Sequence, residues 1–485
     1  MPIYSKGYVV TSSSRSSASC NGAPAESWAA SAVFKAYDIR GKVPGQLDTD
    51  FARQLGQALA QQARTQGIHG LVVGYDGRLS SPALAQALQE GILSGGIDTI
   101  DLGMVHTPLV YFGAHQKNTG SGVAITGSHN PPDYNGFKIM MGGVTLHGEA
   151  ILELARIMAN PDPLKGISSG THQQIDLSEE YIQYIKDSVV LARPMKIAVD
   201  CGNGVGGKFA ARLYRAMGCT VDELYCDVDG TFPNHHPDPA DPNNLQDLIR
   251  HVKKTDCELG LAFDGDADRL GVVTRSGEII WPDRQLILFA KDVLLRAPGA
   301  SIIYDVKCSR HVSRAIRLAG GKPVMWQTGH SLIKAKLKGS GAPLAGEMSG
   351  HIFFKERWFG FDDGLYAGAR LLEILSRHDI ASAVLEALPK DVSTPEIKLE
   401  MPEGQAHPLI ARLQKDGVFP GATSISTIDG VRAEYRDGFG LARASNTTSV
   451  IVLRFEGDTQ EAVDRIKHEY RQALSALQPD LQFPF

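Results

Sequence analysis

The 485-residue chain has few cysteines, no excess of positive charge and no long apolar run. Its 6 cysteines include no Cys-x-x-Cys pair and are too sparse for a disulfide framework. There are 49 Lys and Arg residues against 54 Asp and Glu, so the chain lacks the excess of positive charge that favours binding to nucleic acid or to an anionic membrane. No apolar run reaches the roughly 18 residues that cross a bilayer. We therefore expect a cytoplasmic protein with reduced thiols, a small-molecule ligand, and neither nucleic acid nor membrane as partner.

The composition is that of ordinary globular material, with 43% hydrophobic and 21% charged residues. A chain of this length is typical of about three or four domains. Residues 1–32 differ, because they are rich in Ser and Ala and show no apolar period. We predict a disordered tail there, and favour a dispensable extension over the alternative of an organelle transit peptide.

One pattern occurs three times: an apolar strand that closes on an aspartate, a polar turn, a helix, a glycine and a second strand. The copies occupy 71–102, 197–225 and 302–326. This order predicts three similar α/β domains with mixed sheets, whose loops after the strand ends face one cleft. After 389 the pattern changes to strands at 394–399 and 449–456, a loop between them and a helix at 459–477, which predicts a smaller α+β domain. The predicted domains are 33–174, 175–278, 279–390 and 391–485.

The segment 126–132, Thr-Gly-Ser-His-Asn-Pro-Pro, places a hydroxyl beside an imidazole and an amide. Gly127 and the two prolines keep it from becoming helix or central strand. Ser128 is therefore a candidate nucleophile, and the alternative is a plain Ser or Asx turn. A serine hydrolase is disfavoured, because Ser128 and His129 are adjacent in a Pro-bounded turn and the Gly-x-Ser-x-Gly elbow is absent.

A second polar loop, Asp-Gly-Asp-Ala-Asp-Arg at 264–269, lies between two apolar runs. Its carboxylates belong to Asp264, Asp266 and Asp268. Like charges this close need a cation, and all-oxygen ligation with little room favours Mg²⁺. An EF-hand is excluded, because Arg269 stands where glycine is required and Arg275 where the bidentate glutamate is required. A phosphate on Ser128 would complete the ligand set.

Two further turns carry polar side chains. Segment 346–351, Gly-Glu-Met-Ser-Gly-His, offers Glu347, Ser349 and His351, a set that hydrogen-bonds vicinal hydroxyls as on a sugar; the alternative for His351 alone is a structural histidine. Segment 443–448 combines one cation with hydroxyl and amide donors, which favours phosphate binding. The members of this predicted phosphate loop are Arg443, Ser445, Asn446 and Thr447.

The four segments, in this order, resemble the four signature loops of the α-D-phosphohexomutases, and the chain from 33 onward is similar to their bacterial phosphomannomutase/phosphoglucomutase branch. The resemblance implies four domains around a central cleft, one loop from each. It implies that Ser128 is phosphorylated and joins the three aspartates in binding Mg²⁺, that the 346–351 turn binds the sugar and that the 443–447 loop binds phosphate. By motif match, other cleft residues are Tyr37, Arg40, Lys138, Arg269, Lys307 and His330. One departure is Thr448-Ser449, where the family often has a proline.

The activity implied by the resemblance is interconversion of glucose or mannose 1-phosphate and 6-phosphate. Ser128 would donate its phosphoryl group, giving glucose 1,6-bisphosphate or mannose 1,6-bisphosphate, which reorients in the cleft and also serves as activator. Arg269 would neutralise charge, and the hydroxyl proton would move through Lys138, His351 or His129, the first two preferred. We expect a monomer. The alternatives are a Mg²⁺ phosphatase and a non-catalytic sugar-phosphate binder.

Overall fold

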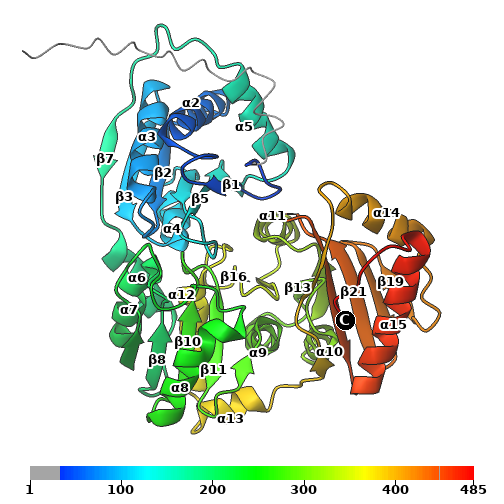
Figure 1. Ribbon diagram of the computed structural model, residues 1–485. Coiled ribbons are helices and arrows are strands. Elements are labelled where there is room, and N and C mark those ends of the chain that lie inside the picture. The colour runs from blue at the N-terminus through cyan, green and yellow to red at the C-terminus, as the bar shows by residue number, and fades with distance from the viewer. Residues whose placement is uncertain (1–32, 447) are drawn as a thin grey trace, which may run out of the picture.

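The computed structural model describes residues 33–446 and 448–485, so the predicted tail at 1–32 and Thr447 lie outside the described residues. Four sheets follow one another along the chain, and their domains surround a shared centre (Figure 1). Three mixed α/β domains are followed by a smaller domain with its own sheet, which confirms the predicted fold class. In the described part of the chain, no helix combines the length and apolarity needed to cross a membrane.

The first domain contains a seven-stranded sheet in the order β1-β5-β4-β2-β3-β7, with β6 beside β5. Its strands are β1 Ile39–Lys42, β2 Gly70–Tyr75, β3 Asp98–Met104, β4 Gly122–Ile125, β5 Tyr134–Met141, β6 Val144–Thr145 and β7 His172–Gln174. Its helices are α2 Thr49–Thr65, α3 Ser81–Ser94, α4 Thr107–Gln116 and α5 Glu149–Ala159. β2 pairs with β3 and β4 in parallel, whereas β5 is antiparallel to β1 and β4. The β4–β5 turn therefore lies at the end of the sheet where β2 also ends.

The second domain has the strand order β12-β11-β10-β8-β9. Its elements are α6 Ser178–Ser188, β8 Lys196–Asp200, η1 Val205–Lys208, α7 Ala210–Ala216, β9 Thr220–Leu224, η2 Pro242–Leu245, α8 Gln246–Lys254, β10 Leu259–Phe263, β11 Leu270–Thr274 and β12 Ile279–Ile280. β12 lies beyond the predicted boundary at 278 and still pairs with β11. Its helix α7 begins at Ala210, after the 3-10 turn η1.

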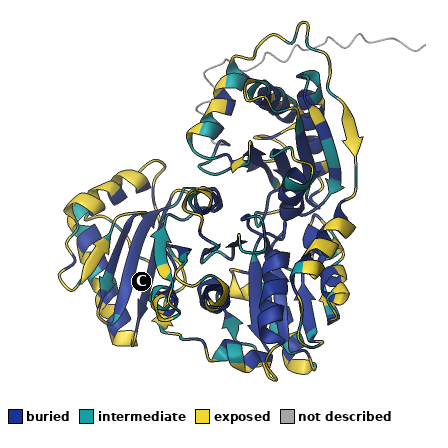
Figure 2. Cartoon of the chain, turned by 180° about the vertical axis from the view of Figure 1, so that it is seen from behind, coloured by how far each residue is buried: buried dark blue, intermediate teal, exposed yellow. Residues whose placement is uncertain are grey.

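The third domain has the strand order β14-β13-β15-β16. Its elements are α9 Pro282–Arg296, β13 Ser301–Asp305, α10 Arg310–Leu318, β14 Lys322–Trp326, α11 His330–Ser340, β15 Leu344–Gly346, β16 Ile352–Phe354, α12 Gly364–Leu375 and α13 Ala381–Glu386. One apolar cluster runs from the first domain through the second into the third. These three domains therefore share a continuous core, and the exposed residues lie mainly on their outer helices and loops (Figure 2).

The fourth domain has a six-stranded sheet and a core of its own. Its elements are β17 Val392–Ser393, β18 Ile397–Glu400, α14 Ala406–Asp416, β19 Ser424–Ser426, β20 Val431–Tyr435, β21 Gly438–Ala444, β22 Val450–Gly457 and α15 Gln460–Leu477. The prediction of a loop between the strands at 394–399 and 449–456 was wrong, because α14, β19, β20 and β21 lie there. The glycines of β21 interrupt the alternation of apolar and polar residues that would predict a strand. At Gly440, the ring of Tyr470 occupies the space that a side chain would fill.

Candidate active site

Ser128 lies in the turn that joins β4 to β5, buried at 1% exposure. Its φ of 50° is in the left-handed region, which is uncommon for a residue other than glycine and occurs often at functional sites. The backbone N–H of Ser128 donates to Thr126 Oγ1 at 2.7 Å. Ser128 Oγ donates to Asp264 Oδ2 at 3.0 Å and lies 3.3 Å from His129 Nδ1. The predicted nucleophile is therefore in direct contact with the predicted metal loop, residues 264–269, although the two come from different domains.

Arg78, which the sequence did not single out, holds this turn. Its guanidinium donates to the carbonyl oxygens of Ser128 and Asn130 at 2.7 Å each, and Pro131 and Tyr134 also accept from it. Asp76 pairs with Arg78 at 3.1 Å beneath the turn. Gly127 is required here, because a Cβ at this position would collide with the guanidinium. In the sequence, Arg78 looks like a surface arginine in a Gly-containing turn. The one pointer to its role was Asp76, the aspartate that closes the preceding strand.

We predict that Arg78→Lys lowers kcat by about a hundredfold, the effect typical of a reacting group misplaced by about 1 Å. Lysine keeps the charge but cannot reach four carbonyl oxygens with one ammonium group. The measurement is steady-state turnover of glucose 1-phosphate. Arg64→Lys is the matched control, because Arg64 also donates to a backbone carbonyl of the first domain, that of Gly95, and should keep full turnover. Equal activity of both variants would remove Arg78 from the account.

The three aspartates of the metal loop between β10 and β11 are fully buried, and their carboxylate oxygens lie within 4.8 Å of one another. Lys138 Nζ contacts Asp266 Oδ2 at 2.7 Å and Asp268 Oδ2 at 2.5 Å. Asp266 Oδ1 is buried, and among the described residues it accepts no hydrogen bond. Three converging carboxylates and an unsatisfied buried oxygen fit a hard cation such as Mg²⁺.

The charges in this loop are unevenly balanced. Burial and the neighbouring Asp268 carboxylate raise the pKa of Asp264 well above its ordinary value. Burial disfavours the Lys138 ammonium, yet Asp266 and Asp268 outweigh it and raise the pKa of Lys138 well above its ordinary value. One lysine thus pairs with two of the three carboxylates, and the third, beside Ser128, has its ion pair with Arg269 at the longer distance of 3.8 Å.

His351 connects the metal loop to the 346–351 turn. Its Nε2 lies 3.2 Å from Asp268 Oδ1, and its Nδ1 lies 3.0 Å from Ser349 Oγ and 3.4 Å from Glu347 Oε2. Burial opposes the charged ring, but Asp268 raises the pKa of His351 to about 9. The 346–351 turn therefore presents a charged imidazole with a carboxylate and a hydroxyl beside it. Glu347 is fixed by the Gly329 N–H, which donates to it at 2.6 Å.

Two more predicted residues lie next to this group. The ring of His330 stacks on His351 with centroids 5.7 Å apart. Arg269 forms a backbone bridge with His351, and its Nε lies 3.8 Å from Asp264. His129, which follows Ser128 in the chain, is different: burial and then the nearby Arg269 hold the pKa of His129 well below its ordinary value. His129 Nδ1 lies 3.3 Å from Ser128 Oγ, whereas His351 pairs with Asp268 of the 264–269 loop.

The predicted phosphate loop begins on a strand. Arg443 lies near the end of β21, which corrects its expected place in a loop, and its Nε pairs with Asp429 at 3.0 Å. Asn446 Nδ2 donates to the hydroxyl of Tyr37, a residue of the first domain. Ser445 Oγ accepts from the backbone N–H and the hydroxyl of Thr448, the first residue of the Thr448-Ser449 departure. Thr447, the last predicted member of the loop, lies outside the described residues.

A cavity of about 520 Å³ adjoins this loop and is lined from the first, third and fourth domains. Tyr37, Thr328 and Asn446 are among its lining residues, and Tyr37 donates to the Thr328 carbonyl at 2.9 Å. Of the remaining predicted residues, Lys307 pairs with Glu396 at 2.7 Å across the third and fourth domains. Arg40 pairs with Asp38 and is one of the cations that lower the pKa of His129.

Family models match four consecutive parts of the chain. They describe phosphoglucomutase/phosphomannomutase alpha/beta/alpha domains I, II and III and the C-terminal domain, and they match residues 31–165, 179–277, 281–392 and 396–473.

Individual relatives agree with the family models. A phosphoglucomutase of Neisseria meningitidis is 56% identical over 453 residues, covering 93% of this chain and 98% of the relative. A phosphomannomutase/phosphoglucomutase of Pseudomonas aeruginosa is 53% identical over 454 residues, covering 93% and 97%. A crystal structure of a phosphoglucomutase/phosphomannomutase family protein from Burkholderia thailandensis superposes with a TM-score of 0.90 at 53% identity, covering 94% of this chain and 99% of that one. The chain therefore belongs to the phosphoglucomutase/phosphomannomutase family, one of the α-D-phosphohexomutases that its four loops resemble.

Proposed function

We propose that this protein interconverts hexose 1-phosphates and hexose 6-phosphates of glucose and mannose, through a phosphoserine at residue 128 and a hexose 1,6-bisphosphate. The observation that carries the proposal is the 3.0 Å contact between Ser128 Oγ and Asp264, inside a buried group of carboxylates and cations. Such a site suits phosphoryl transfer, which depends on positioning and charge neutralisation more than on covalent chemistry. Membership of the family supports the same activity.

The residues proposed to hold Mg²⁺ are Asp264, Asp266 and Asp268, together with a phosphate oxygen on Ser128. When bound, Mg²⁺ would neutralise charge on the phosphoryl oxygens as a Lewis acid. The buried and unsatisfied Asp266 Oδ1 supports this ligand set. Arg269, held beside His351, supplies a second positive charge on the side of Asp264.

In the transfer step, the bond between Ser128 Oγ and phosphorus breaks and a bond between the substrate hydroxyl and phosphorus forms. The hydroxyl proton passes to one of His129, Lys138 and His351, which all contact Ser128 or the metal loop. In the return step, the other phosphate of the bisphosphate transfers to Ser128 and the product hydroxyl regains a proton. The cycle consumes no water and releases no free phosphate.

The bisphosphate must turn around between the two steps, and we place this freedom in the fourth domain. That domain has its own core, and a small apolar cluster of Val306, Phe439 and Leu441 joins it to the third. Interdomain contacts of this kind commonly allow relative motion. Arg443 would hold the distal phosphate in either orientation, while Glu347 and Ser349 hydrogen-bond the sugar. A monomer suffices, because one chain supplies every group in the scheme.

We predict that Arg443→Lys raises KM for glucose 1-phosphate about tenfold and changes kcat less than threefold. A lysine keeps a charge but loses the planar fork that binds phosphate through two hydrogen bonds, and charge-assisted bonds of this kind contribute about 1.5–3 kcal/mol. The measurement is steady-state kinetics. Arg465→Lys, at an exposed ion pair of the same domain, should leave KM unchanged. A fall in kcat at constant KM would place Arg443 at the reacting centre instead.

The function is tested by incubating the protein with glucose 1-phosphate, Mg²⁺ and a trace of glucose 1,6-bisphosphate. Formation of glucose 6-phosphate supports the mutase. Release of free phosphate would support the phosphatase, and no turnover would support the binder. The same assay with mannose 1-phosphate tests the proposed dual specificity, which fails if only one of the two sugars is converted.

A further inference from the structure

The second domain carries a cluster of three unlike side chains far along its sheet from Ser128. Asp222 lies on β9, His251 in the last turn of α8, and Cys257 just before β10. β10 ends at the metal loop, so Cys257 and Asp264 lie at opposite ends of the same strand. The cluster is therefore separate from the candidate active site.

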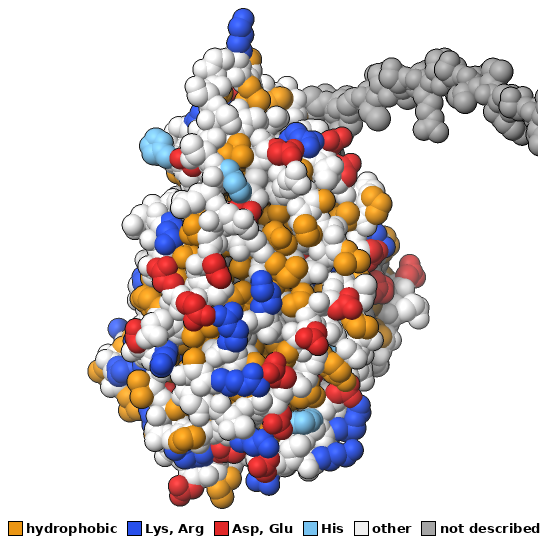
Figure 3. Space-filling model, turned by 90° about the vertical axis from the view of Figure 1, so that its left-hand side faces the viewer, with side chains coloured by type: hydrophobic (Ala, Val, Ile, Leu, Met, Phe, Trp, Pro, Cys, Tyr) orange, Lys and Arg blue, Asp and Glu red, His pale blue; other side chains and the backbone are white. Residues whose placement is uncertain are grey.

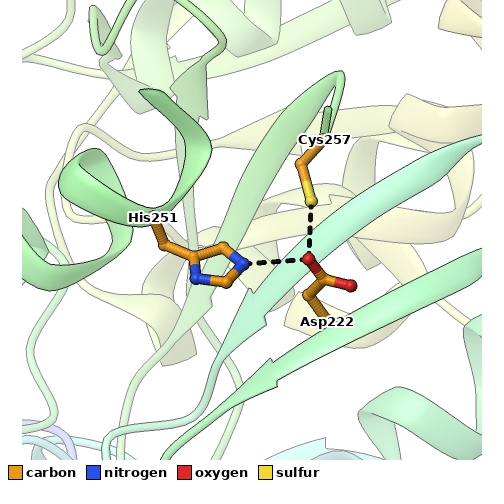
Figure 4. Close-up of side chains that lie close together, drawn as sticks. All are labelled: Asp222, His251 and Cys257. Carbon is orange, nitrogen blue, oxygen red and sulfur yellow. Dashed lines mark hydrogen bonds and ion pairs between the residues drawn. The ribbon is translucent and has the colours of Figure 1, made fainter. Parts of the chain in front are cut away.

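In this Asp–His–Cys cluster, His251 and Cys257 both contact the same carboxylate oxygen of Asp222 (Figure 4). His251 Nε2 lies 2.9 Å from Asp222 Oδ2, and Cys257 Sγ lies 3.3 Å from the same oxygen. All three ligand atoms lie within 4.8 Å of one another. Each comes from a different element of the rigid second domain, so their arrangement is set by the packing of α8 against the sheet.

The cluster is reached from solvent on one side. Cys257 is fully buried, whereas the side chains of His251 and Asp222 are 31% and 26% exposed. An ion bound there would have protein ligands on the inner side and a water molecule on the outer side. A site with three protein ligands and one water is a common arrangement for Zn²⁺.

One cation already lies nearby. Lys196 Nζ is 3.7 Å from Asp222 Oδ2 and also pairs with Asp256. Its distance from Asp222 Oδ2 exceeds those of His251 and Cys257. It competes for the carboxylate charge and would weaken the binding of any ion to the cluster.

We propose that Asp222, His251 and Cys257 form a binding site for a zinc-class transition-metal ion, distinct from the magnesium loop. Thiolate, imidazole and carboxylate are the three donor types that Zn²⁺ uses in proteins. The bond lengths of Zn²⁺ place tetrahedral donors roughly 3.4–3.7 Å apart. The distances of His251 and Cys257 from Asp222 Oδ2, 2.9 and 3.3 Å, are a few tenths of an ångström shorter than this. Mg²⁺ takes oxygen ligands and does not compete.

Binding replaces the two hydrogen bonds to Asp222 with metal bonds. The Cys257 thiol loses its proton to solvent, the sulfur and His251 Nε2 each bond to the ion, and Asp222 Oδ2 becomes the third ligand. No electron transfer is involved. Burial raises the pKa of the Cys257 thiol to about 11, so the proton must be displaced by the metal itself. The bound ion would tie α8 to β9 and to the start of β10.

The test uses Co²⁺ as a spectroscopic probe on the full chain, with Mg²⁺ in excess. A cobalt–thiolate bond gives a charge-transfer absorption band in the near ultraviolet, and the triple-aspartate loop contains no thiol that can produce it. We expect one equivalent of Co²⁺ to produce the band in the unmodified protein and Zn²⁺ to remove it by displacement. Absence of the band would overturn the proposal.

Variants identify the ligands. Cys257→Ser should lose the band, and His251→Gln should weaken Co²⁺ binding at least tenfold. Cys219→Ser is the matched control, because Cys219 is a buried thiol of the same domain outside the cluster, and it should keep the band. Lys196→Gln should tighten binding. Mutase turnover with saturating Mg²⁺ should be unchanged in Cys257→Ser, which shows that the variant is folded; a band that persists in this variant contradicts the proposal.

Discussion

Replacing Ser128 with alanine is expected to lower kcat for the conversion of glucose 1-phosphate to glucose 6-phosphate by at least about a thousandfold, a loss typical of removing a nucleophile. The hydroxyl is the group proposed to carry the phosphoryl between the two ends of the sugar. Within residues 33–446 and 448–485, no other hydroxyl hydrogen-bonds to the Asp264 or His129 side chain. The fold should persist, because the backbone of this turn is held by Arg78 and Thr126.

The experiment compares steady-state turnover and thermal unfolding of Ser128→Ala with those of Ser121→Ala. Ser121 is also a buried serine of the first domain, and its hydroxyl accepts from the Gly142 N–H rather than contacting the metal loop. We expect full turnover in the Ser121 variant and none above background in the Ser128 variant, with similar unfolding temperatures. Full turnover in Ser128→Ala would be incompatible with a phosphoserine mechanism.

The second large effect is expected for Asp266→Asn. The substitution removes one of the three carboxylates proposed to hold Mg²⁺, and the several kcal/mol that a metal contributes to phosphoryl transfer correspond to a loss of about a thousandfold in kcat. Stability should change much less, because asparagine still accepts from Thr107 and Lys138 keeps its contact with Asp268. The concentration of Mg²⁺ needed for half-maximal activity should rise.

Magnesium titrations of the variant and of Asp187→Asn test this expectation. Asp187 is an exposed aspartate on α6 that accepts from Gln183, so its replacement should leave the Mg²⁺ dependence unaltered. A chelator in excess should abolish turnover of the unmodified protein without unfolding it. If Asp266→Asn responds to Mg²⁺ as the unmodified protein does, the metal does not bind at this loop.

The parts of the fold that the sequence predicts are those set by local pattern. Three copies of strand, turn, helix and glycine indicate three α/β domains, because apolar periodicity and helix stops are local properties. The fourth domain was only partly predicted. In β21, glycines at 438 and 440 make room for neighbouring elements instead of supplying apolar side chains, so the strand carries little of the expected alternation.

In the candidate site, too, local features could be predicted and long-range contacts could not. Its chemical groups could be named from four short motifs, but the motifs do not say what holds them in place. Arg78 supports Ser128 from a turn 50 residues earlier in the sequence. Lys138 neutralises two aspartates of another domain at separations of 128 and 130. Contacts at such separations depend on how the domains pack, which one sequence does not reveal.

The surface is consistent with a small-molecule ligand. On the face shown in Figure 3, acidic and basic side chains are interspersed rather than gathered by sign. The formal net charge is only −5, with 49 basic and 54 acidic residues. Buried charged groups gather around Ser128, where they can act on a phosphorylated sugar.

The most direct test of the account is to trap the phosphorylated enzyme. The protein is mixed with glucose 1,6-bisphosphate labelled on its phosphates, separated from free ligand, digested and mapped by mass spectrometry. We predict one phosphoryl group per chain, located on Ser128 and transferred to glucose 1-phosphate or mannose 1-phosphate when either is added. Label on another residue, or label on Ser128 that passes only to water, would contradict the phosphoserine mutase described above.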